Sequence, residues 1–136
     1  MNMITVNATI QAPITKVWDY WTNPEHVKNW NFAASEWHCP EATNNLEVGG
    51  EFHYTMSAKD NSFSFDFWGT YQKIELGVNL EIILGDGRHM KVLFEKKDNT
   101  TIVTESFEPE KVNPEEMQRA GWQMILDNFK KYVQGA

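Results

Sequence analysis

The sequence contains one cysteine and no long apolar run. A single cysteine excludes a disulfide within the chain, and it fits a reducing compartment. No stretch approaches the ~20 apolar residues that a membrane-spanning helix needs. The first residues, MNMITVNATI, also lack the basic start and long apolar run of a signal peptide. We therefore expect a cytoplasmic protein with no membrane span.

Basic residues are scarce as well. Twelve lysines and arginines stand against nineteen aspartates and glutamates, which gives a formal charge of -7. A nucleic-acid backbone would be repelled by this charge unless a local basic patch overcame it. The paired lysines at 96–97 and 130–131 are too few to make such a patch. We expect no nucleic-acid partner.

The histidines and the cysteine show no grouping that marks a metal site. Their positions are scattered, without the paired spacing of zinc ligands. His38 and Cys39 are adjacent, but neighbours in extended backbone point to opposite faces, so His38 is badly placed to activate the thiol. Only a turn there would bring the two side chains together. We expect no metal, no cofactor and no catalytic cysteine, and we interpret this pair as part of the packing.

Two carboxylates, Asp66 and Glu105, raise the question of acid–base chemistry, because paired carboxylates can divide the acid and base roles. Strand alternation turns Asp66 away from Phe65 and Phe67. The face of Glu105 stays open, because the apolar residues of its segment, TIVTESF, do not alternate cleanly. The pattern predicts no catalytic residue.

Large aromatic side chains are abundant, since six Trp, eight Phe and four Tyr make up 13% of the chain. So many rings either fill a core or line a hollow. Residues 3–10 alternate apolar and polar side chains, which predicts a strand. Pro13 and Pro24 each suit the first turn of a helix, which predicts two short helices, the second ending near Trp30.

Between residues 46 and 109 the pattern changes to alternating segments separated by turn signals such as Asp86-Gly87. This predicts a five-strand antiparallel meander with one densely apolar face. From Pro114 onward, apolar side chains recur at helical spacing over roughly 20 residues. A sheet with one apolar face and a long apolar helix pack economically when the curved sheet wraps the helix.

Six segments in this order resemble a known superfamily. They are APITKVWDYWTNPEHVKNW, VGGEFHYTM, FDFWGTYQKI, DGRHMKVLFE, TESFEPE and QRAGWQMILDNFKKYV. Together they resemble the START-like (SRPBCC, Bet v 1-like) superfamily and, within it, the family named after the activator of heat-shock-protein-90 ATPase. The resemblance implies one α+β domain over residues 1–136 with a helix-grip fold, in which a curved six-stranded antiparallel sheet wraps a long C-terminal helix and two short helices follow strand 1.

The resemblance also implies a cavity, because members of this superfamily often hold an apolar ligand between helix and sheet. We therefore expect binding of a hydrophobic or aromatic small molecule or a lipid-like ligand, with Tyr54 and His38 supplying the polar contacts. Rings this large could instead fill the space completely. The residues expected to contact a ligand are Trp30, Phe32, Trp37, His38, Phe52, Tyr54, Met56, Phe65, Phe67, Met90, Trp122, Ile125 and Phe129.

Two other functions stay open. One is a polyketide cyclase/aromatase- or hydrolase-like enzyme that uses the same cavity; the other is a chaperone-associated or stress-response interaction protein. The chain is expected to be a monomer or a homodimer, and Trp68 on the outer face is a candidate dimer contact. Residues 35–42, SEWHCPEA, are expected to form a lip of the cavity. Many members carry two adjacent tryptophans where this chain has Trp30 and Asn31, which changes the pocket mouth.

Overall fold

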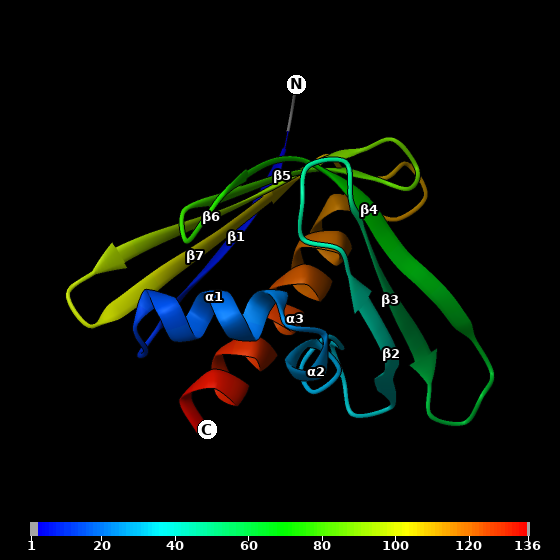
Figure 1. The fold of residues 1–136 in the computed structure, drawn as a ribbon. Coiled ribbons are helices and arrows are strands. Elements are labelled where there is room, and N and C mark those ends of the chain that lie inside the picture. Colours follow the sequence, from blue (N-terminus) through cyan, green and yellow to red (C-terminus); the bar gives the residue numbers. More distant parts are fainter. Residues whose placement is uncertain (1–2, 136) are drawn as a thin grey trace.

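The computed structural model describes residues 3–135 and shows an antiparallel sheet that curls around the C-terminal helix (Figure 1). The α+β architecture, the two short helices and the long helix confirm the expected order. The strands are β1 (Ile4–Ile10), β2 (Trp37–Asn44), β3 (Glu51–Ala58), β4 (Ser64–Glu75), β5 (Asn79–Leu84), β6 (His89–Lys97) and β7 (Thr100–Phe107), and the helices are α1 (Ile14–Thr22), α2 (Pro24–Val27) and α3 (Glu115–Gly135).

The sheet has seven strands in the order β1-β7-β6-β5-β4-β3-β2, so the expected count of six is wrong. The additional strand is β2, which contains most of the segment expected to be a lip of the cavity. It pairs with β3 at the edge of the sheet, and its register shifts between His38 and Glu41. Pro40 lies in this irregularity, where a residue without a backbone N–H is tolerated. The bulge interrupts the alternation, and this hides the strand in the sequence.

Strand β7 has a well-defined inner face. It lies between β1 and β6, and its buried residues are Thr101, Val103, Glu105 and Phe107. Ile102, on the opposite face, is partly exposed. The structure thus settles a point that the sequence left open, because the side chain of Glu105 faces the interior of the protein.

The long helix α3 packs against β1 and α1. Leu126, Phe129 and Val133 form its buried stripe and have no exposed surface. The ring of Phe129 contacts those of Trp21 and Trp30, at centroid distances of 5.0 and 4.8 Å, and the two tryptophan rings lie 4.9 Å from each other. Figure 1 shows α1 and α2 beside the C-terminal half of α3. Among the helices that the structure describes, none is long and apolar enough to cross a membrane.

The outer face of the sheet carries a polar cluster. His53 Nδ1 lies 2.7 Å from Asp66 Oδ2, and His53 Nε2 lies 2.8 Å from Glu51 Oε1. The hydrogen bonds to Asp66 and Glu51 raise the pKa of His53. The His53 ring also stacks on Trp68 with a centroid distance of 5.2 Å. Asp66 faces outward, as alternation predicts, and Trp68 is partly covered by this stacking.

Replacing Gly121 with alanine is expected to stabilise the protein. Gly121 lies inside α3, and no heavy atom outside its own local helix lies within 4 Å of the position that a Cβ would occupy. Alanine loses less backbone entropy than glycine on folding, so the free energy of unfolding should rise by about 0.5–1 kcal/mol. Urea denaturation measures this change. Gly50→Ala is the matched control and should destabilise, because its Cβ would collide with the Asn45 carbonyl oxygen; a destabilised Gly121→Ala would contradict the account.

Candidate functional site

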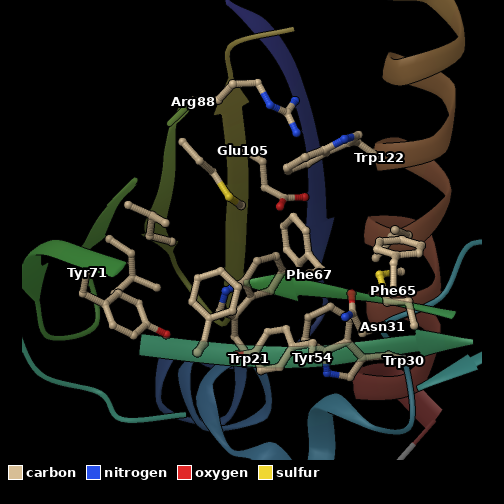
Figure 2. A pocket seen from close by; sticks show the side chains of 16 residues that line it. Trp21, Trp30, Asn31, Tyr54, Phe65, Phe67, Tyr71, Arg88, Glu105 and Trp122 are labelled. Carbon is tan, nitrogen blue, oxygen red and sulfur yellow. The ribbon is translucent and has the colours of Figure 1, made fainter. Parts of the chain in front are cut away.

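A cavity of about 240 Å³ lies between α3 and the inner face of the sheet (Figure 2). Strands β3 to β7 supply most of its wall, α3 supplies two residues, and α1 and the segment after α2 close one end. The wall is mostly aromatic and aliphatic. The lining residues are Trp21, Trp30, Asn31, Phe52, Tyr54, Met56, Phe65, Phe67, Tyr71, Leu80, Ile82, Arg88, Met90, Glu105, Trp122 and Ile125.

Most of the residues expected to contact a ligand are brought together around this cavity. The alternation of the strands explains why, since one face of β3 and one face of β4 both point inward. Ligand binding by these residues stays a prediction. The expected residues that line the cavity are Trp30, Phe52, Tyr54, Met56, Phe65, Phe67, Met90, Trp122 and Ile125.

Four expected residues lie outside the lining: Phe32, Trp37, His38 and Phe129. Phe129 is fully buried in the core beneath the cavity. The ring of Trp37 packs edge-to-face against Phe65 at a centroid distance of 6.2 Å, so it contacts a wall residue without lining the cavity itself. His38 lies on the edge strand β2, and Phe32 is only partly buried in the segment after α2. Sequence alternation could not place them, because three of the four precede or lie within the bulged strand.

The lining also includes residues that the sequence analysis did not select: Trp21, Asn31, Tyr71, Leu80, Ile82, Arg88 and Glu105. Trp21, Leu80 and Ile82 lie on apolar faces that the periodicity does indicate. Tyr71 shares the face of Phe67 on β4, so extending that alternation would have found it. Arg88 has no such signal, because it belongs to the turn between β5 and β6.

Glu105 contributes a carboxyl group to the wall of this cavity, and the residue is 5% exposed. Its neighbours in register are Val6 on β1 and Val92 on β6, and both are buried. No described residue donates a hydrogen bond to its carboxyl group. Burial raises the pKa of Glu105 to about 8, so the group is mostly protonated and uncharged at neutral pH.

The guanidinium group of Arg88 is engaged elsewhere. Its Nε donates a hydrogen bond of 2.7 Å to Asp86 Oδ2, and its Nη1 donates one of 3.1 Å to the Glu108 carbonyl oxygen. Figure 2 shows the side chain at the end of the cavity where Glu105 and Trp122 also lie. Its contacts anchor Arg88 to the β5–β6 turn, so its charge does not offset the burial of Glu105.

The other polar groups of the wall are two tyrosines and an amide. Burial raises the pKa of Tyr54 well above its usual range and that of Tyr71 to about 12, so both rings carry a protonated hydroxyl. The Tyr71 hydroxyl donates a hydrogen bond of 2.8 Å to Asn44 Oδ1. The Nδ2 atom of Asn31 is buried without a hydrogen-bond partner among the described residues.

Cys39 and His38 do not form a reactive pair. Cys39 is buried, and its Sγ donates a long hydrogen bond of 3.5 Å to the Glu41 carbonyl oxygen. Burial raises the pKa of this thiol to about 11, so at neutral pH it is protonated and a poor nucleophile. Both residues lie outside the cavity, which agrees with a packing role.

Comparison with known proteins gives the chain a family. The solution structure of an AHSA1-like protein from Aeromonas hydrophila is 40% identical, with a TM-score of 0.93 over 98% of this chain and 93% of that one. A protein from Cytophaga hutchinsonii is 47% identical, with a TM-score of 0.85 over 99% and 94%. A protein from Chromobacterium violaceum, at 17% identity and a TM-score of 0.86 over 98% and 99%, shares the fold.

No protein with a curated description matches the chain. Residues 11–134 match the sequence profile described as "Activator of Hsp90 ATPase homolog 1-like protein". This match spans nearly the whole chain, and it agrees with the order of segments on which the resemblance was based. The chain therefore belongs to the AHSA1-like family within the START-like (SRPBCC) superfamily.

Proposed function

We propose that this protein binds a small hydrophobic or aromatic molecule in the cavity between α3 and the sheet, without covalent catalysis. The observation that carries this proposal is the cavity itself, about 240 Å³ in volume, with a wall made mostly of rings and aliphatic chains. An apolar cavity of about 150 Å³ is enough to hold benzene. Ligand pockets are typically apolar with a few fixed polar groups, and the polar lining residues here are Asn31, Tyr54, Tyr71, Arg88 and Glu105.

Small aromatic compounds are therefore expected to raise the melting temperature of the protein. A ligand that binds only the folded state stabilises it by mass action, about 2.7 kcal/mol at a hundred times the dissociation constant. Indole, naphthalene and benzothiophene are suitable probes for a thermal-shift measurement. Ile125→Trp is the control, because a larger ring at this lining position fills the cavity from α3. Equal shifts in wild type and Ile125→Trp, or no shift in either, would count against cavity binding.

A second candidate is an enzyme that acts in the same cavity. The observation that favours it is that Glu105 and Tyr54 line the same cavity, since a carboxyl group that titrates near neutral pH is suited to general acid–base catalysis. His38, which was expected to supply a polar contact, does not line the cavity. Incubation with a bound probe followed by mass spectrometry separates the two functions: a binding protein returns the compound unchanged, and an enzyme returns a product.

A further inference from the structure

The Glu105 side chain is buried and has no hydrogen-bond partner among the described residues. The residue is 5% exposed, and no described residue donates a hydrogen bond to its carboxyl group. Buried polar groups are nearly always hydrogen-bonded, because leaving one unpaired is costly. Its register neighbours are valines on both sides, so an apolar residue at this position would serve the fold at least as well. The fold alone gives no reason for a carboxyl group here.

The other groups of the wall do not satisfy Glu105. Arg88, the charged residue that shares the cavity, gives its hydrogen bonds to Asp86 and Glu108. The Tyr71 hydroxyl donates to Asn44 instead. Desolvation is the cause of the raised pKa of Glu105, which agrees with the lack of a compensating charge. A hydrogen-bond partner for Glu105 therefore has to come from the contents of the cavity, either water or a ligand.

The rings beside Glu105 indicate the shape of the molecule that would bring this group. Trp122 stacks on Phe107 with a centroid distance of 3.8 Å and an interplanar angle of 13°. Phe67 meets Trp122 edge-on at 5.9 Å. Figure 2 shows the Glu105 side chain near Phe67 and Trp122, and all three residues line the cavity. These rings already contact one another, so a flat aromatic ligand would pack against the ring surfaces that they turn toward the cavity, where stacked and edge-to-face contacts are favoured.

We propose that the ligand is an uncharged aromatic molecule with a hydroxyl or ring N–H group, which donates its hydrogen to the Glu105 carboxyl. This inference rests on the proposed binding function and names the polar feature of the ligand. An uncharged donor fits better than a cation, since an ammonium group would require two buried charges to lose their water among apolar walls. The carboxyl oxygen accepts the hydrogen bond whether or not the group carries a proton.

Two probes of nearly the same shape test this proposal. Indole has a ring N–H, and benzothiophene has sulfur at that position. Dissociation constants for both are measured by NMR titration of wild type, Glu105→Gln and Glu105→Met. Because benzothiophene is the more apolar probe, the informative quantity is the ratio of the two constants in each variant. Glutamine keeps an acceptor oxygen, whereas methionine has a similar length and no oxygen.

The proposal predicts that the preference for indole over benzothiophene is about tenfold larger in wild type than in Glu105→Met. This preference is the ratio of the two dissociation constants in each protein. Glu105→Gln should keep most of this gain. The same ratio in wild type and Glu105→Met would overturn the role of Glu105 and leave the binding function standing. If neither probe binds any of the three proteins, both proposals fail.

Discussion

Replacing Glu105 with glutamine is expected to raise the free energy of unfolding by about 3 kcal/mol at pH 7. In the folded protein burial raises the pKa of Glu105 to about 8, from an ordinary value of 4.5. Each pH unit between these two values costs the folded state about 1.4 kcal/mol, because the unfolded chain can ionise while the buried group cannot. Glutamine has the same shape and never ionises, so it escapes this cost. Urea denaturation at a series of pH values measures the difference.

The stability difference between the two proteins should change with pH in one direction. The folded-state pKa is raised, so the stability associated with protonated Glu105 is fully present below pH 4.5 and is lost as the pH rises toward 8 and above. The difference between wild type and Glu105→Gln should therefore be smallest near pH 4, grow with pH and level off above about pH 8. Other titrating groups, such as His53, are present in both proteins and cancel in the difference. A difference that does not change with pH would contradict the buried, unpaired carboxyl group.

Replacing Phe129 with alanine is expected to lower the free energy of unfolding by about 3–5 kcal/mol. Phe129 has no exposed surface and packs against Trp21 and Trp30, so its removal takes away apolar burial and leaves a void in the core. Ile125 lies one turn earlier on α3 and already borders the cavity. Ile125→Ala should cost about 1–2 kcal/mol, because this side chain is only partly buried and loses fewer contacts.

These two variants separate the core from the cavity wall on a single helix. Denaturation with urea gives both stability changes, and the thermal-shift assay gives the effect on probe binding. The account expects a large stability loss for Phe129→Ala and a larger effect on probe binding for Ile125→Ala. If the two variants cost the same stability, Phe129 and Ile125 would not differ in packing as the structure describes.

Much of the fold could be predicted from the sequence because local patterns and tertiary packing agree there. The alternation of β1 matches its burial at every position, and the apolar spacing of α3 matches its buried stripe. Strand β2 could not be predicted, because a bulge at its start breaks the period-two pattern and Pro40 argues against a strand. Its pairing with β3 is a long-range feature that no local pattern reports.

The candidate site could likewise be predicted only in part. Alternation indicates which residues of β3 and β4 face inward, and Phe52, Tyr54 and Phe67 do face the cavity. It could not indicate the facing of Glu105, since Ile102 and Val103 give conflicting signals in β7. Nor could it give the distance between helix and sheet, which decides whether the rings close the space or leave a cavity. That distance depends on the packing of α3 against β1 and α1.

The most direct test of the central claim is an NMR titration of isotopically labelled protein with indole. The account predicts saturable chemical-shift changes that concentrate at residues around the cavity, including Phe67, Trp122 and Ile125. Residues of the outer face, such as His53, should serve as the internal reference and stay unchanged. Changes that fail to saturate, or that gather on the outer face and leave the cavity residues unmoved, would contradict a binding cavity between α3 and the sheet.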